Sequence, residues 1–328
     1  MLRFIAGVLM VGGMSAAFGQ LAVSARSGMV NHLEGRVTLA GEPLKLRFGQ
    51  FPEVAPGTEM AAEDGRAEVL LNPGVFLRLD EHSAFKMVSN KLTDAQVELT
   101  SGAALVEVQE LEKSNNVTIL VGGSRVSLLK IGLYRFDVSP ARVRVYDGKA
   151  VVAAESGPLT LTKGHEAELG AVPVADKFNT TKGRDELYTW SQYRAQLVAQ
   201  ANLVSARTAQ SQGYRMSSSS WAYSPYWGMY TFLPRTGVGY SGFGMYVYSP
   251  YTIWQYYTPR YAPAYGAQQG GAAANGNFGG ASVQTRGAAA SVDSGGTGTR
   301  PSFGGGAGAG AAPVSAGAGA AGVGRRGR

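Results

Sequence analysis

The sequence predicts an all-β module over residues 27–172, built as an antiparallel β-sandwich, a roll or a solenoid. Two observations lead to this prediction. Apolar and polar residues alternate with period two in short runs, which places one set of side chains in a core and the other towards solvent. Turn signals separate these runs about every 8–12 residues, and no helical pattern lies between them.

The clearest pair of predicted strands lies between Val54 and Phe85. Asn72-Pro73-Gly74 separates the two strands, because proline fixes φ near −65° and glycine accepts a positive φ. The residues expected in the core are Ala67, Val69, Leu71, Val75, Leu77 and Leu79, and those expected towards solvent are Glu68, Leu70, Phe76, Arg78 and Asp80.

Several more strands follow. One run leads through Ser101-Gly102 and ends near Val108, and two others flank Gly122-Gly123. Asp147-Gly148 lies between two apolar runs and predicts a two-residue hairpin, because both central residues of such a turn need a positive φ. Further strands are expected over 134–138 and 159–161.

An ordered series of these motifs resembles the FecR-type domain family of bacterial envelope proteins, over about residues 27–170. The matching motifs are Val54-Ala55-Pro56-Gly57-Thr58, the strand 65–71, Asn72-Pro73-Gly74, Leu77-Arg78-Leu79, Ser83, the hairpin 97–108, Gly132 with Phe136, and the run 143–151. The resemblance implies an all-β periplasmic domain, a sandwich-like or solenoid-like roll. Founding members are inner-membrane regulators that relay a transporter signal to a cytoplasmic sigma factor. We expect this chain to depart from that pattern in two ways: no cytoplasmic portion or membrane span is predicted ahead of the module, and Leu133 follows Gly132 where the family commonly has threonine.

The first residues are typical of a signal peptide. Arg3 precedes an apolar run of about eleven residues, 4–14, and Ala17-Phe18-Gly19 fits a cleavage site before Gln20. The run is short for a membrane span, although an uncleaved anchor is the alternative. We therefore expect residues 1–19 to be removed and the protein to be exported, to the periplasm or the cell surface. The chain has no cysteine, which excludes a lipid-anchored N-terminus, disulfides and thiol chemistry.

A helix is predicted over residues 184–211, with Asp185 as its N-cap. Its apolar face is expected to consist of Leu187, Trp190, Leu197, Ala201 and Val204. This face would pack on the sheet or pair with a second copy of the helix.

Charge and composition change after the helix. Residues 1–212 hold 22 basic and 22 acidic residues, whereas the remainder holds eight arginines and one acid, Asp293. Residues 213–265 are rich in Tyr, Trp, Gly and Pro and contain 12 of the 16 tyrosines. Residues 266–328 are nearly all small, and this Gly/Ala-rich basic tail is expected to be disordered.

The aromatic segment contains two short repeats, Tyr223-Ser224-Pro225-Tyr226 and Tyr248-Ser249-Pro250-Tyr251. Aromatic rings with polar tips suit sugar stacking, protein interfaces and packing on their own module equally. The candidate contacts to a ligand or partner are Trp221, Tyr226, Trp227, Tyr230, Tyr251, Trp254, Arg325, Arg326 and Arg328.

No catalytic, cofactor-binding or metal-binding residue is predicted. Gly237 to Gly242 matches GxGxxG but lacks a surrounding βαβ unit. Asp80-Glu81-His82-Ser83 holds triad-type residues at adjacent positions that cannot face one another. The three histidines, His32, His82 and His165, lack metal-ligand spacing. Nucleic acid is not expected as a partner of an exported protein.

Two functions from different classes remain open. The first is a non-enzymatic envelope protein in which the module serves as a binding or scaffold domain. Its aromatic segment and tail would attach it to an anionic envelope surface or a polysaccharide such as peptidoglycan, and self-association is possible. The second is a periplasmic signalling or sensory component that works through a membrane protein. The first is the one the sequence favours, because the net charge and most aromatic residues follow residue 212.

Overall fold

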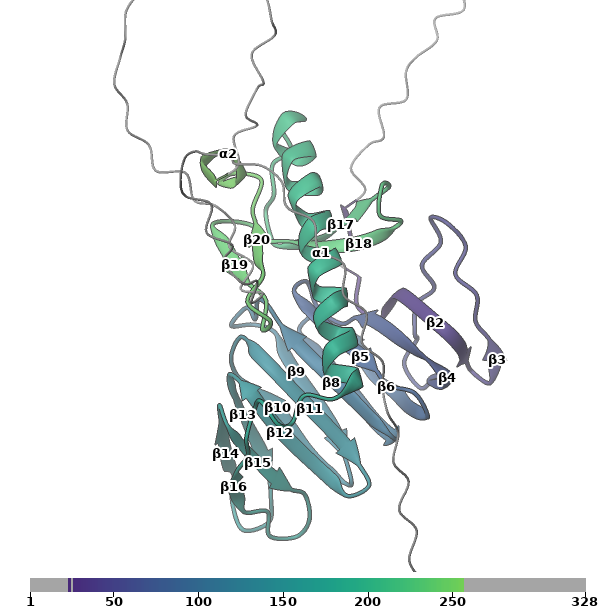
Figure 1. Cartoon of the computed structure of the whole chain (residues 1–328), viewed down its shortest axis with the longest axis vertical. Helices are drawn as coiled ribbons and strands as arrows, with labels where there is room; N and C mark the ends of the chain where they lie inside the picture. The colour runs from purple at the N-terminus through teal and green to yellow at the C-terminus, as the bar shows by residue number, and fades with distance from the viewer. Residues whose placement is uncertain (1–22, 25, 257–328) are drawn as a thin grey trace, which may run out of the picture. The chain divides into compact units, whose positions relative to one another are not determined.

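The computed structural model describes residues 23–24 and 26–256 (Figure 1). They fall within one compact unit, 1–271. The predicted signal peptide 1–19, the tail 266–328 and the end of the aromatic segment lie outside the described residues. Of the helices in the described part, none is long and apolar enough to cross a membrane.

The predicted all-β fold is confirmed: a single 15-stranded sheet folds back on itself and is nearly closed. It bends at β4 (Glu59–Leu70), which pairs with one half of the sheet through its first residues and with the other half through its last. β2 (Met29–Leu39) follows β4 along its length and also pairs with β3 (Glu42–Pro43). One half contains β14 (Leu159–Thr162), β13 (Lys149–Ala153), β10 (Ser124–Leu128), β9 (Asn116–Val121), β7 (Asp94–Ser101) and β6 (Ser83–Lys91). The other contains β5 (Val75–Leu79), β8 (Ala103–Val108), β11 (Gly132–Val138), β12 (Ala141–Asp147), β15 (His165–Glu168) and β16 (Ala175–Lys177).

The chain winds back and forth between the two halves, mostly two strands at a time. Hairpins β6–β7, β9–β10, β11–β12, β13–β14 and β15–β16 stay within one half, and the connections between them cross to the other. The Gly122-Gly123 turn joins β9 to β10 as expected, with Val121 opposite Ser124.

The predicted hairpins at Asp147-Gly148 and across 97–108 are wrong. β12 pairs with β11 and β15, whereas β13 pairs with β10 and β14, so Asp147-Gly148 is a crossing between halves. The same holds for Ser101-Gly102, because β7 pairs with β6 and β9 and β8 pairs with β5 and β11. At Gly148 the glycine makes room for a neighbouring ring: a Cβ there would collide with the Tyr134 hydroxyl.

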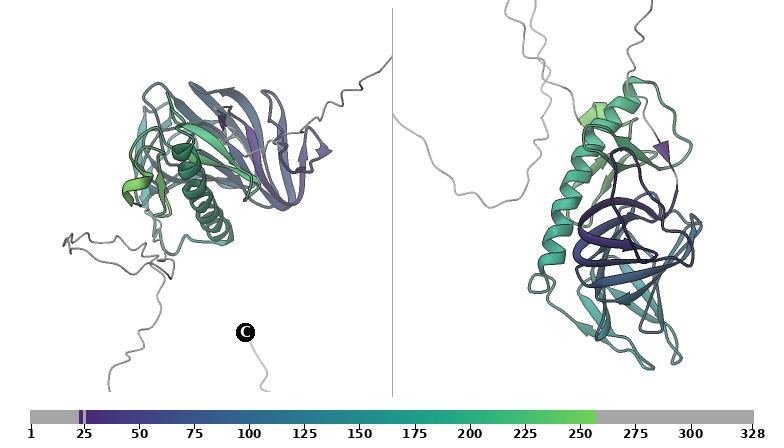
Figure 2. Two further views of the ribbon diagram at one scale, coloured as in Figure 1. Left: turned by 90° about the horizontal axis from the view of Figure 1, so that it is seen from above. Right: turned by 90° about the vertical axis from the view of Figure 1, so that its right-hand side faces the viewer.

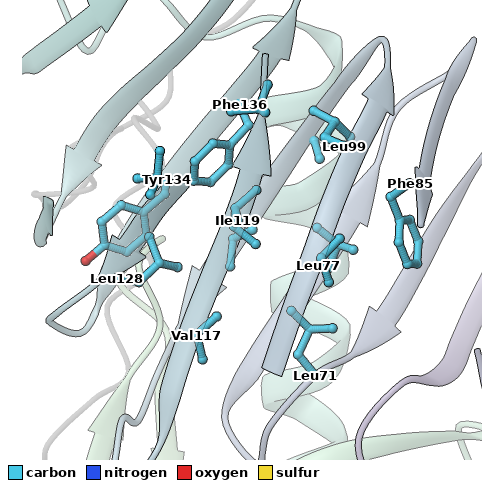
Figure 3. Close-up of a cluster of buried hydrophobic side chains, with 14 of the residues drawn as sticks. Leu71, Leu77, Phe85, Leu99, Val117, Ile119, Leu128, Tyr134 and Phe136 are labelled. Atoms are coloured by element: carbon cyan, nitrogen blue, oxygen red, sulfur yellow. The ribbon is translucent and has the colours of Figure 1, made fainter. Parts of the chain in front are cut away.

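The main core lies between the two halves of the sheet. Leu71, Leu77, Phe85, Ile119 and Phe136 all point into it (Figure 3) and are fully buried or nearly so. The predicted inward set of β4 and β5 is therefore confirmed.

The helix α1 (Glu186–Ser211) runs along one outer side of the sheet (Figure 2, right). Asp185 is its N-cap, as predicted, and accepts a hydrogen bond from the Tyr188 nitrogen at 3.0 Å. The chain then forms two small sheets and a short helix: β17 (Ser220–Ser224) with β18 (Met229–Leu233) and β1 (Val23–Ser24), β19 (Val238–Tyr240) with β20 (Tyr246–Tyr248), and α2 (Ile253–Tyr256).

The buried face of α1 differs from the predicted one. Leu187, Trp190 and Ala201 are buried, but Leu197 is only partly buried and Val204 is 45% exposed. The buried face includes Arg194, Val198, Asn202 and Ser205 instead. Polar residues are buried there because the helix packs on backbone carbonyls and on the Glu68 carboxylate, which need hydrogen-bond donors. Asn202, for example, donates to the carbonyls of Phe232 and Tyr248 at 2.8 and 3.0 Å and accepts from the Tyr248 nitrogen at 2.7 Å.

Candidate functional site

The outer face of β4, β5 and β8 carries a buried ionic network. The predicted solvent exposure of Glu68, Leu70, Phe76 and Arg78 is wrong: all four are fully buried. The reason is a second layer, formed by α1 and the strands β17 to β20, that covers this face (Figure 1). The alternation of β4 and β5 therefore separates two buried faces.

The network joins four charged side chains from three strands and the helix. Arg78 donates to Glu68 through Nε at 2.9 Å and to Glu107 through Nη1 at 2.7 Å. Arg194 of α1 donates to the other oxygen of Glu68 at 2.9 Å. Two arginines thus balance two glutamates, and Asn31 of β2 adds a hydrogen bond to Glu68 at 2.9 Å. Paired, hydrogen-bonded charges are the form in which ions are tolerated in a protein interior.

The glycine-rich segment 237–242 completes this network. The Ser241 hydroxyl and the Gly242 nitrogen, the latter at 3.2 Å, both donate to Oε1 of Glu107. Gly242 lies against the sheet, where a Cβ would come within 3.0 Å of the Leu133 side chain. The GxGxxG match is therefore a loop that holds a carboxylate of its own chain.

Burial and charge act in opposite directions on Glu68. Loss of solvent raises the pKa of its carboxyl, but Arg194 and Arg78 together outweigh this effect and hold the pKa well below its usual value. The ionised form is therefore favoured by the folded state.

This lowered pKa predicts an acid-dependent contribution to stability. Since the folded pKa lies below the unfolded value of about 4.3, the contribution is present above that pH and is lost as the pH falls towards the folded pKa. We expect Glu68→Gln to be less stable near neutral pH and to show a shallower loss of stability below about pH 4.5. Urea unfolding between pH 7 and pH 3 measures this. Glu42→Gln, which removes an exposed carboxyl, is the matched control. Parallel pH profiles for wild type and Glu68→Gln would contradict the prediction.

The repeated Tyr-Ser-Pro-Tyr sequence forms the same turn twice. In each copy the serine is buried and its carbonyl accepts hydrogen bonds from the nitrogens three and four residues later. These distances are 3.2 and 2.9 Å for Ser224, from Trp227 and Gly228, and 3.2 and 3.0 Å for Ser249, from Thr252 and Ile253. The proline suits the position that follows the strand because its φ is fixed. Each turn leaves its second tyrosine exposed, Tyr226 in the first and Tyr251 in the second.

The first turn belongs to an aromatic cluster that we call the tip. Phe51 packs edge-on against Tyr223 and Tyr230, with ring centroids 5.4 and 4.8 Å apart. The Phe48 ring lies edge-on to Tyr223 at 6.4 Å, and the Tyr226 ring lies edge-on to the neighbouring Trp227 at 5.4 Å. Phe48 and Tyr226 are the most exposed rings of the tip.

The second turn belongs to a row of tyrosines on β19, β20 and α2, which we call the tyrosine row. Tyr240 lies directly opposite Tyr246, with centroids 4.8 Å apart, and Tyr246 stacks along the strand with Tyr248 at 6.4 Å. Tyr256 of α2 continues the row at 5.7 Å from Tyr248. Trp254 lies on the same short helix and donates its indole N–H to the Tyr251 carbonyl at 2.9 Å.

The structure separates the candidate contact residues that it describes into three groups. Trp221 is fully buried, whereas Tyr226, Tyr251 and Trp254 are exposed. Trp227 and Tyr230 are partly buried beside the tip. Arg325, Arg326 and Arg328 lie outside the described residues.

Four exposed aromatic residues of the tip and the tyrosine row are not among the candidates chosen from the sequence: Phe48, Tyr240, Tyr246 and Tyr256. The alternation Tyr246-Val247-Tyr248 is a signal that could have found part of the row, because period two puts both rings on one face. Phe48 carries no comparable signal, since it lies in an irregular loop.

The histidines and the Asp80–Ser83 cluster occupy ordinary positions in the fold. His32, His82 and His165 lie on β2, on the turn before β6 and at the start of β15. Within residues 23–24 and 26–256, no group of three His, Cys, Asp or Glu side chains is placed to hold a metal. Asp80 pairs with Arg66 at 2.9 Å, and Ser83 is buried with its hydroxyl accepting from the Ala103 nitrogen.

Comparison with known proteins agrees with the fold. Residues 58–154, which contain β4 to β13, match the family model described as FecR protein. Residues 58–154 therefore belong to a FecR-type domain. Proteins with this domain are associated with the bacterial envelope. No curated protein matches the chain.

Two solved structures are similar to part of the FecR-domain chain. Both are crystal structures, at 2.50 and 1.65 Å resolution, of a candidate anti-sigma factor from Parabacteroides distasonis. Each is 15% identical, has a TM-score of 0.35 and covers 41% of this chain. The matched part spans 64% of the length of that protein.

Proposed function

We propose that this FecR-domain protein is an exported, non-enzymatic envelope protein whose β-module is a scaffold for binding polysaccharide. The observation that carries the proposal is the tyrosine row, flanked by Tyr251 and Trp254. Tyr240, Tyr246 and Tyr256 are exposed, as are Tyr251 and Trp254, while the largely buried ring of Tyr248 lies between those of Tyr246 and Tyr256. A row of rings offers flat faces for the C–H side of sugars and hydroxyls for hydrogen bonds.

The row is held firmly, which favours recognition because little freedom is lost on binding. Asn202 of α1 binds the Tyr248 backbone through two hydrogen bonds, at 3.0 and 2.7 Å. The Tyr251 hydroxyl accepts from the Met216 nitrogen at 2.9 Å. The aromatic surface is therefore part of the folded unit and rests on the FecR-type domain through α1.

Charge favours an anionic polymer such as peptidoglycan. Residues 213–256 contain two arginines, Arg215 and Arg235, and no acid. The part of the chain beyond residue 256 adds six more arginines and one acid. Attraction of this kind weakens as salt is added.

A signalling role through a membrane protein is the second candidate. The family, and the anti-sigma-factor description of the two solved structures, favour it. It predicts specific retention by a membrane protein that survives high salt, whereas the first proposal predicts retention by polysaccharide.

The test measures retention of the chain from Gln20 on isolated envelope polysaccharide across a salt series. We expect Tyr240→Ser with Tyr246→Ser to weaken retention by about tenfold or more, since each ring contributes about 1 kcal/mol of contact energy. The control removes two exposed apolar side chains from α1, Tyr193→Ser with Val204→Ser. Equal loss in both variants would argue against a site at the row.

A second arm of the same experiment tests the charge. Arg325, Arg326 and Arg328 are changed to serine, and the control changes the exposed Lys113, Lys130 and Lys182 instead. A smaller salt dependence of retention only in the arginine variant supports electrostatic attraction between the tail and the polysaccharide.

Shortened chains should end at Gly271, the end of the compact unit, because ending at 212 would uncover Glu107 and Phe76.

A further inference from the structure

The two most exposed large apolar side chains of the described residues lie close together at the tip. Phe48 is 80% exposed and Tyr226 is 82% exposed. They are distant in sequence, and the fold joins their turns: the Phe48 ring lies over Gly228, where a Cβ would come within 3.6 Å of it. Exposed apolar rings gathered from separate segments mark an interaction surface.

Phe48 and Tyr226 each lie in a tight turn. The Phe48 turn is closed by a hydrogen bond from the Gln50 nitrogen to the Arg47 carbonyl at 2.9 Å. The Tyr226 turn is closed by the Ser224 carbonyl, as described above. Both turns lie at the right of Figure 1, where the loop after β3 approaches the β17–β18 hairpin. With such high exposure, neither ring can line a pocket, so the two rings project from the surface.

The loop that carries Phe48 is basic. Residues 44–52 contain the exposed Lys45 and Arg47 and no acid. The nearest acids along the chain, Glu42 and Glu53, lie outside this loop, and Glu53 accepts a hydrogen bond from Asn90 at 2.7 Å.

We infer that the tip docks on the surface of an anionic lipid bilayer. Phe48 and Tyr226 would insert at the boundary between headgroups and acyl chains, and Lys45 and Arg47 would lie among the lipid phosphates. A lipid surface suits the tip better than a glycan does, because a phenylalanine ring offers no hydrogen bond and a projecting ring cannot enclose a sugar. This surface shares no residue with the tyrosine row, so it stands apart from the proposed function.

Vesicle flotation of the chain from Gln20 tests the inference. The vesicles contain phosphatidylcholine alone or with about 30% phosphatidylglycerol, because anionic lipid gives the surface the negative potential that attracts Lys and Arg. We expect binding to the mixed vesicles, and at least about a tenfold loss of partitioning for Phe48→Ser with Tyr226→Ser. Lys45→Glu with Arg47→Glu should lose most of the preference for anionic vesicles, because each basic residue near the surface contributes about fivefold.

Matched controls separate the tip from general effects. Tyr193→Ser with Val172→Ser removes two exposed apolar side chains elsewhere, and Lys113→Glu with Lys182→Glu makes the same charge change. Binding that both control variants retain and both tip variants lose supports the inference. No binding by wild type, or equal binding by wild type and the aromatic tip variant, overturns it. Loss of polysaccharide retention by the tip variant, with vesicle binding unchanged, would assign the tip to a glycan instead. Failure of the polysaccharide test at Tyr240 and Tyr246 leaves this experiment unaffected.

Discussion

Arg78→Met is expected to lower the free energy of unfolding by about 3–5 kcal/mol. Arg78 is fully buried and bridges Glu68 and Glu107, and its guanidinium lies 5.4 and 5.8 Å from the ring centroids of Phe76 and Phe243. Removing it leaves Glu107 buried with hydrogen bonds but no counter-charge. An uncompensated buried carboxylate is far more costly than the loss of the attraction alone.

Urea unfolding of the chain from Gln20, followed by circular dichroism, measures this loss. The control is Arg36→Met, which removes an exposed arginine paired with Glu63 and Asp64 and should change stability by less than about 1 kcal/mol. Adding Glu107→Gln to Arg78→Met should restore part of the loss, because the buried negative charge is then gone. Equal effects of Arg78→Met and Arg36→Met would show that the network contributes little.

Trp221→Ala is expected to destabilise the protein by about 3–5 kcal/mol, the usual cost of emptying a buried tryptophan site. Trp221 is fully buried, with its ring 5.1 Å from Phe76 and 6.1 Å from Phe232. It belongs to a cluster that joins Leu70 and Phe76 of the main sheet to β17 and β18. Its loss would therefore weaken the attachment of the second layer as well as the layer itself.

Trp254→Ala provides the matched control, since it removes the same side chain from a site that is 54% exposed. We expect it to cost less than about 1 kcal/mol, because an exposed ring leaves no cavity. The two variants are compared by urea unfolding and by near-ultraviolet circular dichroism. If both variants lose the same stability, Trp221 does not hold the layers together.

The candidate site shows where sequence reasoning succeeds. The repeats containing Tyr226 and Tyr251 were visible in the sequence, and each proves to be one exposed turn. Composition alone, however, treated Trp221 and Trp254 as equivalent. Their burial differs because Trp221 points inward from a three-stranded sheet and Trp254 lies on the last short helix.

The sequence by itself determined the local structure. Period-two alternation located most strands, Asn72-Pro73-Gly74 and Gly122-Gly123 marked true turns, and Asp185 marked the start of α1. These signals are local: a side-chain period and a backbone dihedral depend on neighbouring residues along the chain.

Only the tertiary structure decided which strands are neighbours and which faces are covered. A positive φ at Gly148 allows a hairpin or a crossing equally, and contact with Tyr134 accompanies the crossing. The sequence predicts that Glu68 and Arg78 face solvent, because a buried charge pair has the same sequence pattern as an exposed one. In the structure α1 covers both residues, and its Arg194 forms an ion pair with Glu68. Strand pairing depends on residues tens of positions apart, as for Val75 and Val108, and coverage depends on residues more than a hundred positions apart, as for Glu68 and Arg194. No local period records either.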